Sequence, residues 1–258
     1  LPVFMRIIII TQDDPFYLPE NLDYLLRNVP DGAQVVGCVV SKVSPFGKKE
    51  SFLAKARRTL DIFGVGFFLR YSIEFLATKL PWRRGVRDVL QQHGVDEIPV
   101  TGSLNSEQSL GTLADLKPDL LISIAGNEIF RQPFIELAPL GCLNLHTALL
   151  PKYRGLMPSF WVLRNGETET GVSVFYVDEG IDSGPILVQE RIAIGNMTQR
   201  ELIRESKALG MRAIIKAIEK IRDGDTATMP NDADQSTYFT FPTRDDVRDF
   251  RRAGARFY

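Results

Sequence analysis

The chain has 258 residues, 44% of them hydrophobic and 24% charged, which suits one substantial domain with an appendage, or two small domains. Its 31 Lys and Arg residues balance 32 Asp and Glu residues. The net charge of −1 therefore argues against a protein that wraps nucleic acid and against a polybasic membrane binder. Two cysteines are too few for a cysteine-rich zinc site, and a histidine-dependent site has two candidates, His93 and His146.

Strands that alternate with helices are predicted along the first part of the chain. Short apolar runs predict buried strands at 5–11, 33–41, 98–100, 119–125 and 141–146. Helical spacing predicts helices at 15–29, 48–80, 85–93, 106–116 and 128–137. Within them we expect a break near Gly64 and Gly66, and an N-cap at Asn105. This alternation indicates βαβ units, so we predict an α/β fold with a mostly parallel sheet and flanking helices.

The pattern changes after Pro151. It predicts a short helix at 158–165, strands at 171–177 and 186–194, and a long helix at 198–222. Beyond residue 224 the chain turns polar and ends in alternating aromatics and a basic helix. Thr243 is predicted to cap that helix, because an acidic residue, Asp246, follows three positions later. We therefore separate a main domain, residues 5–223, from a short C-terminal extension, residues 224–258.

The apolar segments are too short to predict a membrane span or a secretion signal. The run at 7–10 is followed at once by polar residues, and the most apolar segment, 60–69, is far short of the ~20 residues that cross a bilayer. Cys38 and Cys142 lie in apolar runs, so we expect buried thiols in a reducing, cytoplasmic compartment. The apolar segment 51–80 is interpreted as an inserted pair of core helices, with a homodimer or membrane-proximal surface left open.

One predicted strand carries two polar side chains at its end. Asn144 and His146 are two residues apart, so they lie on one face of the strand, opposite Leu143 and Leu145. The loop-like sequence at 147–155 follows, which places the pair at the carboxyl end of the strand. Open α/β sheets bind their ligands at that edge. We therefore take Asn144 and His146 as candidate site residues.

An acidic, glycine-rich loop, DEGIDSGP at 178–185, supplies candidate partners. One of its carboxylates can orient His146 for proton transfer, and Asn144 can donate a hydrogen bond to a developing oxyanion. Each signal has a plainer interpretation: a core histidine, a solvated turn and, for His93, a surface residue at a helix end. No GxSxG elbow, Walker loop or histidine pair at metal spacing occurs, so serine hydrolase, P-loop NTPase and zincin chemistry lack support.

The segment 119–194, with LNLHTALLPKYRG and ETGVSVFYVDEGIDSGPIL, resembles the folate-dependent formyltransferase family. That family includes the glycinamide ribonucleotide, methionyl-tRNA and nucleotide-sugar formyltransferases. The resemblance implies a Rossmann-like catalytic domain in which Asn144, His146 and Asp182 form the catalytic set. Asp182 follows His146 by 36 residues, as the family pattern requires.

The resemblance also implies a formyl donor, 10-formyltetrahydrofolate, and no metal ion. AGNEIF, at 125–130, stands where the family has its folate loop. The cofactor-binding residues implied in this way are Gly126, Glu128, Ile129, Phe130 and Asp178.

Several departures from the family pattern bear on the acceptor. Thr147 stands where relatives carry Pro or Ala, and TQDDPFYLPEN after the first strand lacks the glycines of the phosphate loop of glycinamide ribonucleotide formyltransferase. The extension is far shorter than the C-terminal domain of methionyl-tRNA formyltransferase. Elimination favours the amine of a nucleotide-linked amino sugar, a small molecule. The predicted specificity elements are residues 12–20 and 149–155, in which Lys152, Tyr153 and Arg154 can meet phosphate.

Four alternatives stay open. The acceptor can be an amino-acid side-chain amine such as that of hydroxyornithine, or the chain can act like methionyl-tRNA formyltransferase. A third alternative is a non-catalytic folate- or nucleotide-binding domain, but such a domain has no need of Asn144, His146 and Asp182 together. A nucleic-acid-binding tail is a fourth alternative, but the arginines of the extension are interleaved with aspartates, so its net charge is modest.

Overall fold

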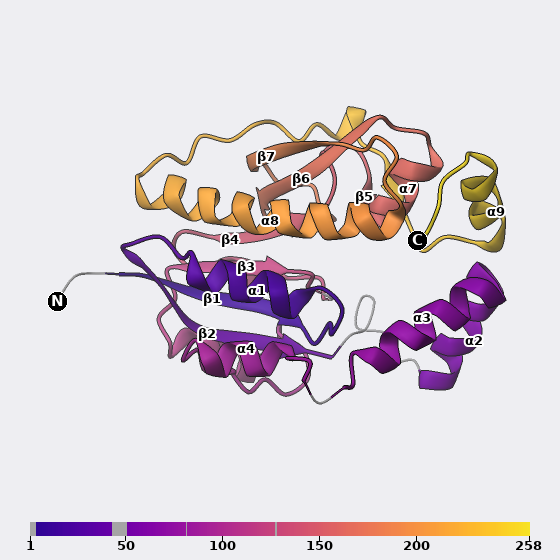
Figure 1. Cartoon of the computed structure of the whole chain (residues 1–258). Helices are drawn as coiled ribbons and strands as arrows, with labels where there is room; N and C mark the ends of the chain where they lie inside the picture. The colour runs from indigo at the N-terminus through magenta and orange to yellow at the C-terminus, as the bar shows by residue number, and fades with distance from the viewer. Residues whose placement is uncertain (1–3, 43–50, 81, 127) are drawn as a thin grey trace.

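The computed structural model describes residues 4–42, 51–80, 82–126 and 128–258, and its centre is a six-stranded sheet of order β2-β1-β3-β4-β6-β7 (Figure 1). The strands are β1 (Met5–Gln12), β2 (Ala33–Ser41), β3 (Leu120–Ile124), β4 (Cys142–His146), β6 (Glu169–Tyr176) and β7 (Ile186–Ala193). The first four strands of the chain pair in parallel, whereas β6 and β7 are antiparallel. The predicted α/β class with a mostly parallel sheet is therefore confirmed.

Helices cover both faces of this sheet. The main helices are α1 (Leu18–Arg27), α4 (Val86–Gln92), α5 (Glu107–Ala114), α6 (Gln132–Ile135), α7 (Pro158–Arg164) and α8 (Gln199–Arg222). Alternate residues of β1 face opposite sides. Ile7 and Ile9 share a core with α1, α4 and α8, while Ile8 and Ile10 share another with α5 and α6. Figure 1 shows α1 and α8, which contact each other, running along the sheet.

Three predicted elements differ from the structure. Residues 98–100 form no strand, because only a single bridge joins Cys38 to Glu97. The N-cap of α5 is Ser106, whose hydroxyl accepts the amide of Ser109, and not Asn105. Asn105 instead donates to the Glu128 carboxylate and the carbonyl of residue 129, so it holds that neighbouring loop. The loop occupies the first part of the predicted helix 128–137, which shortens to α6.

The predicted helix 48–80 divides into two. Residues 43–50, its basic start, lie outside the described residues; α2 (Phe52–Phe63) and α3 (Val65–Ala77) follow. The break lies at Gly64, whose φ of +83° suits glycine, whereas Gly66 lies within α3. Within the described part of the chain, no helix is long and apolar enough to span a membrane.

His93 is a helix-end residue, as predicted, but its side chain is partly buried rather than fully exposed. It ends α4, its side chain is only 17% exposed, and its Nε2 lies 2.7 Å from Oδ1 of Asp23. This hydrogen bond is the main reason that the pKa of Asp23 is lowered. Cys38 and Cys142 are buried free thiols, and burial raises the pKa of Cys142 to about 12. These three side chains therefore serve packing and local pairing.

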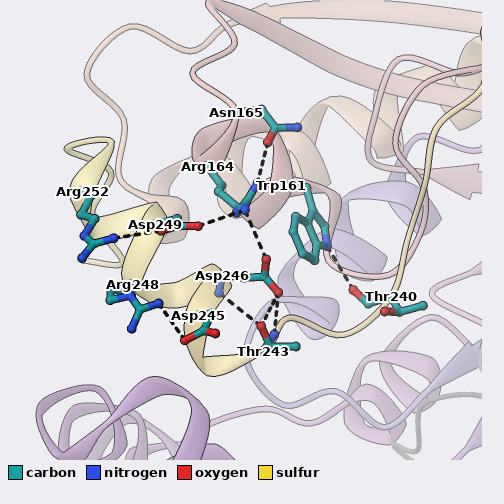
Figure 2. A network of polar contacts seen from close by, with 10 residues as sticks. All are labelled: Trp161, Arg164, Asn165, Thr240, Thr243, Asp245, Asp246, Arg248, Asp249 and Arg252. Carbon is teal, nitrogen blue, oxygen red and sulfur yellow. Dashed lines mark hydrogen bonds and ion pairs between the residues drawn. The ribbon is translucent and has the colours of Figure 1, made fainter.

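The C-terminal extension packs against the rest of the molecule. Its helix α9 (Arg244–Arg252) is capped by Thr243, as predicted, and contacts α2 and α7. Figure 2 shows Arg164 of α7 between Asp246 and Asp249 of α9, at 3.4 and 3.3 Å. Phe250 is fully buried and stacks on Phe160 of α7. The extension therefore shares a hydrophobic core with α7.

A second contact of the extension lies next to the predicted site. The short strand β8 (Tyr238–Phe239) pairs in parallel with β5 (Arg154–Gly155), in the loop that follows β4. Gly155 has a φ of +94°, and a Cβ there would lie 2.2 Å from the carbonyl oxygen of Phe239. The close approach of the two strands therefore requires glycine at this position.

Candidate active site

A cavity of about 540 Å³ lies at the carboxyl ends of the parallel strands. Gln12 at the end of β1, Ile124 at the end of β3 and His146 at the end of β4 all line it. Asn144 and Asp182 line the same cavity. The fold thus brings the three predicted catalytic side chains together at the edge where open α/β sheets hold their ligands.

The ring of His146 contacts one partner on each nitrogen. Nε2 lies 2.7 Å from the carbonyl oxygen of Tyr153, and Nδ1 lies 3.5 Å from Oδ2 of Asp182. A carbonyl oxygen only accepts hydrogen bonds, so Nε2 carries the proton in the neutral ring. Nδ1 is then the nitrogen that can take up a proton, and the Asp182 carboxylate lies where it stabilises the charged ring.

The loop that carries Asp182 is tightly constrained. Asp182 has a φ of +50°, a left-handed conformation that few residues other than glycine adopt. The amide of Gly155 donates to Asp182 Oδ2 at 2.8 Å. At Gly184 a Cβ would lie 1.8 Å from the carbonyl oxygen of Tyr176, so the loop can pass the end of β6 only with glycine there. Strained backbone of this kind concentrates at functional sites.

The five predicted cofactor-binding residues line a smaller neighbouring cavity of about 100 Å³. They are Gly126, Glu128, Ile129, Phe130 and Asp178. Asn144 and Asp182 line both cavities, so the two form adjoining parts of one site. Ser123 also lines the small cavity, and its Oγ is buried without a hydrogen-bond partner among the described residues. A ligand with a polar edge would supply that missing partner.

Two of these five side chains already have local partners. Glu128 accepts from the Leu104 amide at 3.0 Å and from Ser103 and Asn105, while Asp178 accepts from Gly180 and Ser183 within its own loop. Their carboxylates therefore shape the cavity wall through loop conformation. A contact of either with a ligand stays a prediction.

Tyr153 and Arg154 do not meet the expectation that they face a phosphate. The Tyr153 hydroxyl donates to Glu167 at 2.6 Å, and burial together with this bond raises the pKa of Tyr153 to about 12. Arg154 is buried, and its Nη2 donates to the carbonyl oxygen and Oδ1 of Asn231 at 3.0 and 2.8 Å. Both side chains point into packing contacts because the extension covers this loop. Lys152 lines a separate cavity of about 210 Å³.

Asn231 of the extension is a contact that no sequence pattern signalled. Its Nδ2 donates to the carbonyl oxygens of Asp182 and Gly184 at 2.9 and 2.8 Å. Arg154 holds Asn231 from the other side. The extension therefore contacts the Asp182 loop directly through Asn231. The second contact of that loop, from the amide of Gly155 to the Asp182 carboxylate, comes from β5, which pairs with β8 of the extension.

Lys207 of α8 is a second residue outside the sequence prediction. It lines the large cavity, with Nζ 4.0 Å from Oδ2 of Asp14. Burial lowers the pKa of Lys207, and Asp14 opposes that shift. The signal was present in the sequence: Lys207 shares a helix face with Met211, Ile214 and Ile218, where a cation is out of place in a buried stripe.

Sequence comparison places the chain among known proteins. The family model described as formyl transferase matches residues 88–218, about half of the chain, and the chain belongs to this family. A methionyl-tRNA formyltransferase of Kosmotoga olearia is 40% identical over 165 residues, which cover 63% of this chain and 52% of that protein. The chain spans about half the length of the curated relatives it matches.

Solved structures share the fold at lower identity. Glycinamide ribonucleotide transformylase 1 from Symbiobacterium toebii has a TM-score of 0.60 at 19% identity, covering 90% of this chain and 96% of that one. An N-formyltransferase from Helicobacter canadensis, in complex with folinic acid and dTDP-3-aminofucose, has a TM-score of 0.58 at 19% identity. The latter match covers 97% of this chain and 80% of that one. These likenesses show the fold.

Proposed function

We propose that this chain transfers a formyl group from 10-formyltetrahydrofolate to a primary amine. The observation that carries the proposal is the pairing of His146 Nδ1 with Asp182 at 3.5 Å beside Asn144, on the wall of one cavity. Membership of the formyl transferase family supports the same reaction class. A binding domain without catalysis would not require an oriented histidine and carboxylate here.

In the proposed mechanism, each of the three residues has one task. Asn144 donates a hydrogen bond to the oxyanion that forms when the neutral amine attacks the formyl carbon. His146, protonated at Nδ1, adds a positive charge beside the same oxygen, and Asp182 stabilises that charge. Asp182 and His146 then move the proton of the attacking amine toward the nitrogen that leaves the formyl carbon. The new bond joins amine nitrogen to formyl carbon, and the bond from that carbon to the folate nitrogen breaks.

The small cavity suits the donor. When bound, 10-formyltetrahydrofolate supplies the activated formyl group. We propose that the backbone groups of Gly126 and Ile129, together with the unpartnered Ser123 Oγ, would hold its pterin, with Phe130 as an apolar wall. A Cβ at position 126 would lie 2.4 Å from Ser123 Oγ, so any residue other than glycine would clash with that hydroxyl. Asp178 would contribute by shaping the loop opposite.

Two acceptors are candidates. The relatives at 34% to 40% identity are methionyl-tRNA formyltransferases, which supports the amine of a charged tRNA. A nucleotide-linked amino sugar is the second candidate, because Lys207 places a partly dehydrated cation in the large cavity, where it can pair with a phosphate. We further propose that residues 5–223 form the catalytic domain, with 224–258 as its extension, in a cytoplasmic protein whose two cysteines stay reduced.

The deciding experiment is a folate-release assay. The protein and 10-formyltetrahydrofolate are mixed with methionine-charged initiator tRNA, a nucleotide-linked amino sugar, or hydroxyornithine. We expect tetrahydrofolate release that depends on one acceptor, and formylation of that acceptor by mass spectrometry. Folate release at the same rate without any acceptor, or none across the panel, would contradict the proposal.

Replacing Lys207 by Met tests the anion contact. We expect the KM of a phosphate-bearing acceptor to rise about 10-fold or more with little change in kcat, since a charged hydrogen bond contributes about 1.5–3 kcal/mol. Lys216→Met is the matched control, because Lys216 lies on the exposed side of the same helix and pairs with Glu190. Equal KM values for the two variants would remove Lys207 from the acceptor site.

Replacing Asn231 by Asp tests whether the extension positions Asp182. The new carboxylate would repel the carbonyl oxygens of Asp182 and Gly184, so we expect kcat to fall about 10-fold or more while the donor KM holds. Gln235→Glu makes the same chemical change in the extension, at an exposed residue whose side-chain amide donates to Asp232.

A second readout of Asn231→Asp does not depend on turnover. The chain has two histidines, so the NMR ring signals of His146 can be followed with those of His93 as an internal reference. We expect only the His146 signals to move. Unmoved His146 signals together with an unchanged kcat would show that Asn231 does not position the site.

A further inference from the structure

Helix α3 exposes a stripe of aliphatic side chains. Val65, Leu69, Ile73 and Leu76 are 64%, 56%, 68% and 66% exposed. At 3.6 residues per turn they fall within roughly 80° of the helix circumference. Leu53 at the start of α2 and Trp82 after α3 are also exposed, at 79% and 73%. Isolated exposed apolar residues are ordinary, but an aligned set on one helix face marks an interaction surface.

The opposite face of α3 is already used by the fold. Phe67 stacks on Phe63 of α2 at 4.6 Å, and Tyr71, itself 38% exposed, lies 5.3 Å from Phe16. Glu74 pairs with Arg200 of α8. These contacts hold α3 against the rest of the molecule by one face. The aliphatic stripe lies on the other face and points outward.

The segment that carries this stripe has a positive net charge. Residues 51–84 contain seven Lys and Arg residues and two Asp and Glu residues, although the whole chain has a net charge of −1. Arg57, Arg70, Lys79 and Arg83 are all exposed, although Arg57 and Arg70 also pair with acidic residues of their own helices, Asp61 and Glu74. Figure 1 shows α2 and α3 at one end of the molecule, beside the arginine-bearing helix α9. Exposed aliphatic side chains in a basic segment suit contact with a membrane surface that contains anionic lipid.

We propose that the hairpin α2–α3 docks on a bilayer surface that contains anionic lipid. The stripe from Val65 to Leu76 would enter the boundary between headgroups and acyl chains, and the exposed Lys and Arg residues would contact anionic headgroups. This is docking on a surface, in agreement with the absence of a membrane-spanning helix among the described residues.

Charge and shape favour lipid over other occupants. The excess of basic residues in the segment 51–84 disfavours a second copy seated symmetrically on this face, because like charges at an interface are costly. Nucleic acid would pair with the basic residues but would leave Val65 to Leu76 uncovered, because single strands stack on aromatic rings. An anionic bilayer satisfies both features of the surface at once.

The hairpin also lies close to the mouth of the active site. Phe16, which contacts Tyr71 and Phe75 of α3, lies in the short loop between Gln12 and Leu18, both of which line the large cavity. Docking through α3 would therefore hold the cavity near the lipid surface.

Vesicle co-sedimentation of the full chain tests the proposal. We expect binding to vesicles of phosphatidylcholine with phosphatidylglycerol, weaker binding at high salt, and little binding to phosphatidylcholine alone. Leu69→Gln with Ile73→Gln should weaken binding about tenfold or more, because two exposed aliphatic side chains no longer enter the bilayer. Tyr24→Gln with Leu140→Gln, at exposed apolar residues outside the hairpin, is the matched control. Equal thermal midpoints show that both variants fold.

Three results would overturn the proposal. The first is equal vesicle binding by the stripe variant and the control variant. The second is no binding to anionic vesicles by the parent chain. The third is a dimer in light scattering that the stripe variant splits while vesicles are not bound, which would make this face an interface between copies. None of these outcomes depends on formyl transfer, so each is separate from the test of the proposed reaction.

Discussion

Replacing Asp182 by Asn is expected to lower kcat for formyl transfer by about 10²-fold or more, since general acid–base groups contribute roughly 10²–10⁴-fold. The amide keeps the shape of the side chain but loses the charge that lies 3.5 Å from His146 Nδ1. It also loses the capacity to accept the amine proton. Replacing His146 by Asn should have an effect of similar size, because the two side chains act as a unit and their losses are not additive. The measurement is kcat at saturating donor and acceptor.

Matched controls separate chemistry from folding in this experiment. Asp234→Asn makes the same change at an exposed residue of the extension, and His93→Asn removes the other histidine. We expect near-parental kcat in both, with His93→Asn losing some stability because Asp23 loses its partner. Turnover in Asp182→Asn that equals turnover in Asp234→Asn would contradict the proposed role of Asp182.

Replacing Phe250 by Ala is expected to destabilise the whole protein by about 3–5 kcal/mol, the usual range for a buried Phe cut back to Ala. Phe250 is fully buried and stacks on Phe160 at 4.9 Å and on Phe257 at 4.4 Å. Because Phe160 lies in α7, a cavity here weakens the main domain as well as the extension. Chemical denaturation followed by circular dichroism measures the loss.

An exposed aromatic residue provides the control for this measurement. Tyr24 of α1 is 42% exposed, so Tyr24→Ala should change the free energy of unfolding by at most about 0.5 kcal/mol. We also expect Phe250→Ala to unfold in one transition, since the extension and α7 share a core. An early, separate transition for the extension would show that it folds as an independent unit.

Local sequence signals predicted much of the fold. The apolar run 33–41 is strand β2, and the break at Gly64 and the Thr243 cap follow from backbone freedom and side-chain hydrogen bonding within a few residues. The predictions were wrong for residues whose hydrogen-bond partners lie in a distant part of the chain. Asn105 looks like a cap, but residues 128–131 take its hydrogen bonds. His93 looks like a surface residue, but Asp23 lies beside it.

At the candidate site, too, some features follow from the local sequence and others from the tertiary structure. The sequence by itself determined that Asn144 and His146 share one strand face at a sheet edge, because the period of two in a strand is a local property. The residue types of the acidic loop left the partner of His146 open, and the family resemblance implied Asp182. The tertiary structure shows the physical reason: Asp178 bonds within its own loop, and Asp182 reaches the ring. It also decided that Asn231 holds that loop and that Lys207 faces the cavity. Hydrophobic periodicity in the sequence indicates whether a side chain is buried. Which distant residue that side chain contacts depends on how the helices and strands pack together.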